Sequence, residues 1–190
     1  MTQQWIKLAG NWKEGFAYDL HTVSSKHVGH DQYGHDIFET QYTEMGKLIN
    51  QLKYKYDKTV ISAIIDLLQS ANYSTIDVIV PTPPSKKRSS QPVFLIAEEL
   101  GKRLNIPSYY DFFAKKEGNE PLKGMDITKR INASKSTIYI ENSHNVSDKN
   151  ILLIDDIYET GSTLKVVTDL LYYTAKVKNV YVLTATKTRS

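Results

Sequence analysis

The sequence predicts an α/β fold with a mostly parallel sheet, because strand and helix patterns alternate in its second half. Short apolar runs at Ile76–Val80, Ile151–Ile154 and Val180–Ala185 have the length of buried strands. Between them, Gln91–Leu104 and Ser162–Thr174 carry apolar side chains at helical spacing. This strand–helix–strand–helix–strand order is typical of a parallel sheet flanked by helices.

The N-terminal residues have a different pattern. Alternating pieces at Phe16–His21 and Ile37–Thr43 predict strands, joined through turns at His30-Asp31 and Tyr33-Gly34. A further short strand is expected at Thr137–Ile140.

Apolar spacing then predicts a helix over Glu44–Tyr54 and a second helix from Val60 to Leu68. No repeat or linker divides the chain. We therefore expect one domain over residues 1–190, with an N-terminal elaboration at 1–75 and a core at 76–190.

Composition narrows the class of protein. A chain of 190 residues that is 41% hydrophobic and 24% charged suits one soluble core. No apolar run reaches the roughly 18 residues of a membrane span, and the start does not read as a secretory signal. The absence of cysteine excludes disulfides and thiolate metal sites, and it fits a cytoplasmic location.

The segment from Ile151 to Thr163 has the parts of a sugar-phosphate site. Its apolar strand is followed by two adjacent carboxylates, Asp155 and Asp156, at the end where ligands of open α/β sheets bind. The turn Thr160–Thr163 then leads into a helix, and its hydroxyls and backbone N–H groups suit a phosphate. The alternative is that these polar residues merely cap the helix, which leaves the carboxylates unexplained.

This segment, Ile-Leu-Leu-Ile-Asp-Asp-Ile-Tyr-Glu-Thr-Gly-Ser-Thr, resembles the motif with which type I phosphoribosyltransferases bind phosphoribosyl diphosphate (PRPP). The resemblance implies that Asp155 and Asp156 hold the ribose hydroxyls, together with Mg²⁺ bound through PRPP. It implies that Thr160, Gly161, Ser162 and Thr163 bind the 5′-phosphate. Glu159 lies where purine-salvage members often have a proposed general base, so it is either catalytic or a solvated loop residue.

The stretch Asp77-Val-Ile-Val-Pro-Thr-Pro-Pro-Ser-Lys-Lys-Arg88 resembles the pyrophosphate loop of ComF-like members of this family. By this resemblance Lys86, Lys87 and Arg88 supply cations to the pyrophosphate as it leaves. The chain departs from that subgroup after Arg88, where Arg-Gly-Phe-Asn-Gln is usual, and it has no cysteines for the subgroup's zinc ribbon.

A basic, glycine-containing stretch lies at residues 110–140. The resemblance implies that part of it corresponds to the mobile hood that closes over the reacting centre in the family. Lys115, Lys116, Lys123 and Arg130 are candidates to reach the pyrophosphate from it, with a solvated surface loop as the alternative for each.

Two readings of function follow. One is an enzyme that transfers phosphoribose from Mg-PRPP to a nitrogen acceptor, such as a nucleobase or related amine, and releases pyrophosphate. The other is a PRPP- or nucleotide-binding protein without catalysis, regulatory or associated with DNA uptake, as ComF-like proteins are thought to be. Direct nucleic-acid binding is a third reading that rests only on basic clusters, and a homodimer is left open.

Two N-terminal clusters allow further readings. His21, His27, His30 and His35 lie near Asp31 and Asp36, and such a set can bind a metal on a hairpin, although its spacing fits no established pattern. The aromatic residues of the N-terminal strands form either a stacking face or, as we expect, a small core. They are Trp5, Trp12, Phe16 and Tyr18.

Overall fold

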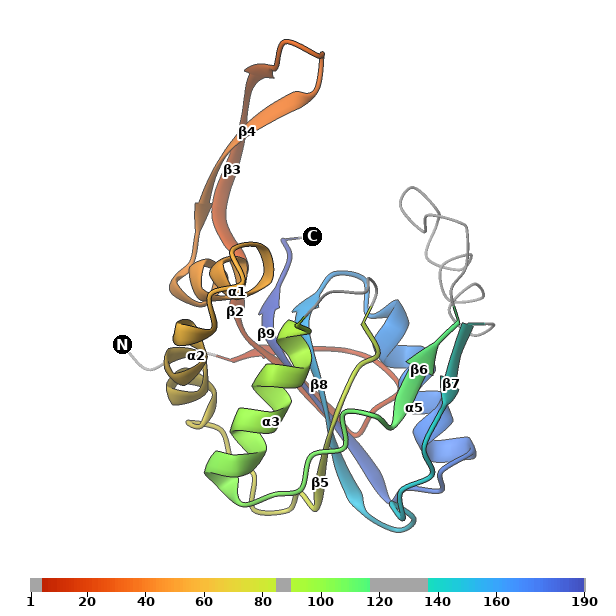
Figure 1. The fold of residues 1–190 in the computed structure, drawn as a ribbon. Helices are drawn as coiled ribbons and strands as arrows, with labels where there is room; N and C mark the ends of the chain where they lie inside the picture. The colour runs from red at the N-terminus through yellow and green to blue at the C-terminus, as the bar shows by residue number, and fades with distance from the viewer. Residues whose placement is uncertain (1–4, 85–89, 117–136, 190) are drawn as a thin grey trace.

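The computed structural model describes residues 5–84, 90–116 and 137–189. Its centre is a five-stranded sheet in the order β1-β2-β9-β8-β5 (Figure 1). The strands are β1 (Ile6–Lys7), β2 (Glu14–Leu20), β5 (Val78–Pro81), β8 (Asn150–Tyr158) and β9 (Asn179–Lys187). All neighbouring pairs are parallel except β1 with β2. The predicted α/β class with a mostly parallel sheet is confirmed.

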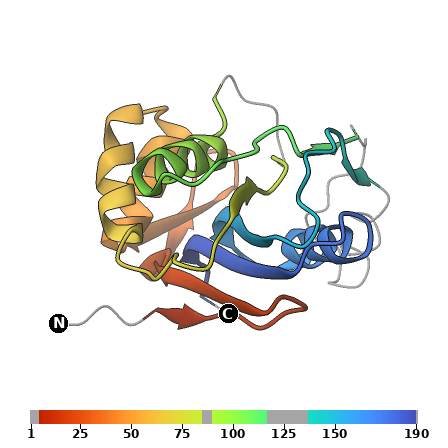
Figure 2. The ribbon, with the colours of Figure 1, turned by 90° about the horizontal axis from the view of Figure 1, so that it is seen from below.

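Helices cover both faces of this sheet. They are α1 (Glu44–Tyr54), the short 3₁₀ turn η1 (Lys58–Val60), α2 (Ile61–Leu68), α3 (Pro92–Leu104) and α5 (Ser162–Tyr173). The apolar sides of α1, α2 and α3 share one core with the sheet, and α5 packs into a second core on the opposite face. Figure 2 shows α5 lying apart from the other three helices. Within the described ranges, no helix has the length and apolar character needed to cross a bilayer.

Strand β8 is buried from both sides, and its side chains alternate between the two cores. Ile151 and Leu153 pack with α5, whereas Leu152 and Ile154 pack with the three-helix side. This double burial explains the uninterrupted aliphatic run in the sequence. It also fixes in space the residues that follow the run.

The N-terminal segment contributes to the same sheet, since β2 pairs with β9. Trp12 is buried in the core with α5, and its indole N–H donates to the Leu8 carbonyl at 3.2 Å. Tyr18 is buried on the other face, with the Trp5 ring against it edge to face at 5.0 Å between centroids. The prediction that these aromatic residues belong to the core is confirmed for Trp12 and Tyr18, which are 8% and 7% exposed.

Two ribbons accompany the sheet. Strands β3 (Thr22–His30) and β4 (Asp36–Tyr42) form an antiparallel hairpin that projects away from the body in Figure 1. Its turn lies between Asp31 and His35, as the turn signals predict. The second ribbon pairs β6 (Phe113–Lys115) with β7 (Ile138–Ile140). The sequence patterns did not indicate β1, β3 or β6.

The boundary of one strand needs correction, and two helix boundaries agree with the prediction. The strand predicted to end at Ile154 continues to Tyr158, because the long β9 offers it partners as far as Lys187. Helix α3 ends at Leu104, as predicted, and the left-handed backbone of Asn105 terminates it. Helix α1 has the predicted bounds, and the Thr43 hydroxyl caps it by accepting the Gly46 N–H at 3.0 Å.

Candidate functional site

The carboxyl ends of four parallel strands meet at one edge of the sheet. Figure 1 places the C-terminus and the base of the β3–β4 hairpin at this edge. The polar residues near these strand ends include Thr82 (β5), Asp155 and Asp156 (β8), Thr186 (β9) and His21 (β2). Ligands of open α/β sheets bind at this edge. The predicted carboxylates therefore lie where the fold favours a site.

Asp155 is half-buried and held by neighbouring donors. The Thr82 hydroxyl donates to its carboxylate, and the Asp156 backbone N–H donates to Oδ1 at 2.9 Å. Burial, followed by the nearby charge of Asp156, raises the pKa of Asp155 to about 7. A diol or a cation at this carboxylate would favour its ionised form. Asp155 is thus a carboxylate that a ligand can stabilise at neutral pH.

Asp156 lies in a different environment from its neighbour. Its Oδ2 forms an ion pair with Lys53 Nζ of α1 at 2.7 Å, and the two side chains are only 14% and 15% exposed. Successive residues of a strand point to opposite faces, so Asp156 is turned toward the α1 side. The two adjacent carboxylates are therefore not equivalent, because Asp156 forms an ion pair with a lysine.

His21 and Thr186 complete the surroundings of Asp156. The His21 Nδ1 lies 3.0 Å from the Thr186 hydroxyl, which in turn donates to the Asp156 carbonyl in a long bond of 3.4 Å. Burial, and next the charge of Lys53, lower the pKa of His21. Gly46 of α1 lies close against this strand end, since a Cβ there would approach the His21 carbonyl oxygen to 1.9 Å.

The turn before α5 is open for an anion. Gly161 is the N-cap residue with a φ of +71°, and it has no side chain that could cap the helix. The hydroxyls of Thr160 and Ser162 bond to each other at 2.7 Å, and the Ser162 N–H donates to the Thr160 hydroxyl in a long bond of 3.4 Å. The capping alternative thus accounts for one N–H group at the start of α5. The other N–H groups of the first turn have no partner within the helix and suit a phosphate.

A glycine is required at the centre of this turn for two reasons. The positive φ of Gly161 is strained for other residues. In addition, a Cβ at this position would lie 2.8 Å from the Tyr158 ring. Tyr158 therefore packs directly against the turn and defines its shape.

The remaining predicted site residues differ in how exposed they are. Glu159 has an exposed side chain between Asp156 and the turn, and Thr163 is half-buried in the first turn of α5. Lys115 is half-buried on β6, and burial lowers the pKa of its amine. Lys116 is exposed. Outside the described residues lie Lys86, Lys87, Arg88, Lys123 and Arg130.

Three contributors to the site were missed from the sequence: Thr82, Lys53 and His21. Thr82 follows a Val-Pro pair and is 2% exposed, so a polar residue after a buried strand was the available signal. Lys53 and His21 carry no local signal, because each is more than one hundred residues from Asp156 in the chain. Folding alone brings them together.

The comparison with known protein families agrees with this geometry. Residues 56–185 match the sequence model of the phosphoribosyl transferase domain. This chain belongs to that family. The match begins after Lys53, so both Lys53 and His21 lie outside the matched range.

Two curated relatives share this family region. Competence protein ComFC of Bacillus subtilis (strain 168) is 30% identical over 129 residues, which is 65% of this chain and 52% of that protein. Transcriptional regulator GfcR of Methanocaldococcus jannaschii is 34% identical over 131 residues, or 68% of this chain and 50% of that protein. The chain thus spans about half the length of each relative. The predicted similarity to ComF-like members is confirmed.

A solved structure shows a more distant likeness. The adenine phosphoribosyltransferase of Thermoanaerobacter pseudethanolicus has a TM-score of 0.45 and 14% identity, over 86% of this chain and 95% of that one. A likeness of this size bears on neither substrate nor activity.

Proposed function

We propose that the protein binds Mg-PRPP at the carboxyl edge of its sheet and transfers phosphoribose to a nitrogen acceptor, releasing pyrophosphate. The carrying observation is the position of Asp155, whose carboxylate has a pKa of about 7, beside the open turn that precedes α5. The turn suits the 5′-phosphate, and the carboxylates suit the ribose hydroxyls. Membership of the family supports this pairing.

The turn and Asp155 would bind two different parts of the ribose phosphate and so fix its position. The N–H groups at the start of α5 and the hydroxyls of Thr160, Ser162 and Thr163 would bind the 5′-phosphate. Asp155 would accept from a ribose hydroxyl while Thr82 holds its orientation. Such fixed contacts place the C1 carbon at a defined point, and that positioning lowers the barrier to transfer.

Lys53 would hold Asp156 in a fixed rotamer and offset the repulsion between the two neighbouring carboxylates. The ion pair leaves the other oxygen of Asp156 for a ligand. Lys53 is therefore assigned a positioning role rather than a chemical one.

The carboxylates also fit the expected Mg²⁺. This ion prefers oxygen ligands and is commonly held through substrate phosphates together with one or two carboxylates. Asp155, whose pKa is raised by burial, is a group that a divalent cation would return to the ionised state. Asp155 and Asp156 would hold the ion with PRPP, and when bound it would neutralise charge on the pyrophosphate.

Transfer breaks the bond from C1 to the pyrophosphate oxygen and forms a bond from C1 to the acceptor nitrogen, which loses a proton. Glu159 is exposed at the same edge and is our candidate to receive that proton. Lys86, Lys87 and Arg88 are proposed to stabilise the leaving pyrophosphate.

The first experiment is calorimetric titration of the protein with PRPP in the presence of Mg²⁺. Wild type should bind at one site, and the Asp155→Asn/Asp156→Asn double variant should bind at least about 100-fold more weakly, the effect of losing about 3 kcal/mol. Asp66→Asn, on α2 and paired with Arg103, is the matched control and should bind like wild type. Failure of wild type to bind, or equal binding by the double variant, would refute the site.

A second candidate is a PRPP-binding protein without catalysis. It is favoured by the relatives, since one carries the name of a competence protein and the other of a transcriptional regulator. Pyrophosphate release over a panel of purines, pyrimidines and amines separates the two. Release that depends on an acceptor and falls in Glu159→Gln supports the enzyme; tight PRPP binding with no release for any acceptor supports the binding protein. Retention on DNA at physiological salt would support the third reading.

A further inference from the structure

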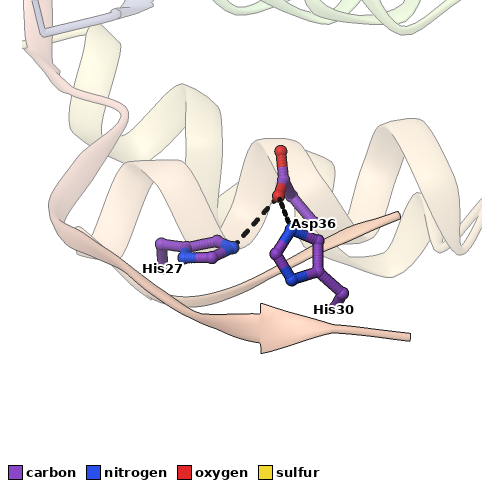
Figure 3. A group of neighbouring side chains, drawn as sticks. All are labelled: His27, His30 and Asp36. Atoms are coloured by element: carbon purple, nitrogen blue, oxygen red, sulfur yellow. Dashed lines mark hydrogen bonds and ion pairs between the residues drawn. The ribbon is translucent and has the colours of Figure 1, made fainter. Parts of the chain in front are cut away.

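The β3–β4 hairpin gathers two imidazoles and a carboxylate at one point. His27 Nε2 and His30 Nε2 each lie 3.0 Å from the same oxygen of Asp36, Oδ1 (Figure 3). The possible ligand atoms of the three residues all lie within 4.8 Å of one another. Among the described residues, no other three histidine, aspartate or glutamate side chains come together this closely.

A distortion of β3 makes this convergence possible. His27 and His30 are three residues apart, so a regular strand would point them to opposite faces. The pairing with β4 shifts between His27 and Gly29, and Gly29 has a φ of +135°. This irregularity adds one residue to β3 and turns both imidazoles toward Asp36. The spacing matched no regular pattern because the regular geometry is broken here.

The other histidines of the predicted cluster lie elsewhere. His35 Nδ1 pairs with Asp31 Oδ2 at 3.1 Å in the turn, and His21 is at the sheet edge. The predicted cluster thus divides into three separate environments. Only the His27, His30 and Asp36 group combines three ligands from two strands.

The separations are those of hydrogen-bonded pairs, and a tetrahedral metal needs little change to them. Bonds of about 2.0–2.1 Å to zinc place the ligand atoms about 3.3 Å apart, within a few tenths of an ångström of the 3.0 Å observed from Asp36. The side chains of His27, His30 and Asp36 are 45%, 59% and 57% exposed. Ion pairs at such exposure contribute little stability, so pairing alone gives weak reason for the convergence.

The two strands of the hairpin have few buried contacts that would stabilise their pairing. Most of β3 and β4 is exposed, including Val28, Ile37 and Phe38 at 52%, 45% and 55%. A two-stranded hairpin that lacks a supporting core is marginally stable in water. A metal bound by two residues of β3 and one of β4 would join the strands close to the turn.

We propose that His27, His30 and Asp36 form a binding site for a zinc-class divalent ion, which cross-links β3 to β4 and keeps a fourth position open to water. Two imidazoles with one carboxylate suit zinc, whereas Mg²⁺ prefers oxygen ligands alone. The site is separate from the carboxyl edge of the sheet and does not depend on PRPP binding.

The test is titration of metal-free protein with Zn²⁺ by calorimetry, with Mg²⁺ present in excess. Wild type should bind one ion per chain. His27→Ala, His30→Ala and Asp36→Asn should each weaken binding by more than the roughly 10- to 100-fold caused by losing an outer-sphere partner. His35→Ala and Asp31→Asn are matched controls on the same hairpin and should bind like wild type.

Gly29→Ala provides a test of geometry with all three ligands retained. A Cβ at Gly29 meets nothing within 4 Å, so the substitution acts through the positive φ alone. It should weaken Zn²⁺ binding at least about tenfold, or about 1.4 kcal/mol. Hydrogen exchange of the β3 and β4 amides should slow when Zn²⁺ is added to wild type and stay unchanged in Asp36→Asn.

Several outcomes would overturn the proposal. They are the absence of saturable Zn²⁺ binding by wild type, an equal loss in His35→Ala, or full affinity in all three ligand variants. The last two results would mean adventitious binding by surface histidines. Circular dichroism and PRPP titration of each variant verify that the body of the protein is intact.

Discussion

Replacement of Asp155 by asparagine should stabilise the protein much more at pH 8 than at pH 5. In the folded protein, burial and the charge of Asp156 raise the pKa of Asp155 from 3.8 to about 7. A carboxyl group with a raised folded pKa contributes stability that is fully present below pH 3.8 and is lost as pH rises through 7. Asparagine stays neutral at every pH, so it avoids this loss.

The size of the stability difference depends on how many pH units separate pH 5 from the folded pKa of Asp155. Between pH 5 and the folded pKa of about 7, each pH unit changes the free energy of unfolding of wild type by about 1.36 kcal/mol relative to the variant. The difference between variant and wild type should therefore grow by about 2–3 kcal/mol from pH 5 to pH 8. Loss of one of the two hydrogen bonds to Asp155 costs about 1 kcal/mol at both values and cancels in this comparison.

The assay is urea unfolding of both proteins at pH 5 and pH 8, supported by thermal unfolding. From pH 3.8 to the folded pKa of about 7 the whole effect is about 4 kcal/mol, so the net gain at pH 8 after loss of a hydrogen bond is about 3 kcal/mol. That gain corresponds to a rise in Tm of about 6–12 °C for a chain of this size. Asp111→Asn is the control. The hydrogen bond from His144 holds the pKa of Asp111 below its usual range, so that variant should not gain stability at pH 8. If Asp155→Asn has the same effect at both pH values, or destabilises only at pH 8, the carboxylate is not a buried charge.

Three further predictions concern the site and the core. Lys53→Met leaves Asp156 without its cation and should lower the free energy of unfolding at pH 8 by about 2–4 kcal/mol in urea, somewhat below the cost for a fully buried pair. Gly161→Ala should lower the free energy of unfolding by about 1–2 kcal/mol because of the positive φ, and it should weaken PRPP binding measured by calorimetry. Gly34→Ala is the control: its φ is +83° with open space around it, so it should lose similar stability and bind PRPP normally. Trp12→Ala should cost about 3–5 kcal/mol by urea unfolding, and a cost under about 1 kcal/mol would mean that β1 and β2 are not part of the core.

Local sequence was enough for the elements of the core. The apolar runs around Ile151 and Val180 predicted strands, because short buried strands are read from composition and length. The bounds of α1 were predicted correctly from helical spacing. The turn Thr160–Thr163 was located because its glycine and hydroxyls stand next to a strand and a helix, and all these signals are contiguous in the chain.

The ends of the strands, and the face on which each side chain lies, were harder to predict from the sequence. The continuation of β8 to Tyr158 depends on the length of β9, which is a distant segment. That continuation makes Asp155 and Asp156 successive strand residues, so they turn toward opposite faces. Similarly, the irregularity at Gly29 sets which histidines of β3 share a face.

The sequence by itself determined that two carboxylates and a turn of glycine and hydroxyl residues follow an apolar run, which was enough to indicate the family. Only the tertiary structure decided what each carboxylate contacts: Asp155 meets Thr82 from β5, and Asp156 meets Lys53 from α1. The physical reason is that a motif depends on neighbours along the chain, whereas charge and burial depend on neighbours in space. Those spatial neighbours are provided by strand order and helix packing, which place Lys53 beside a residue more than one hundred positions away.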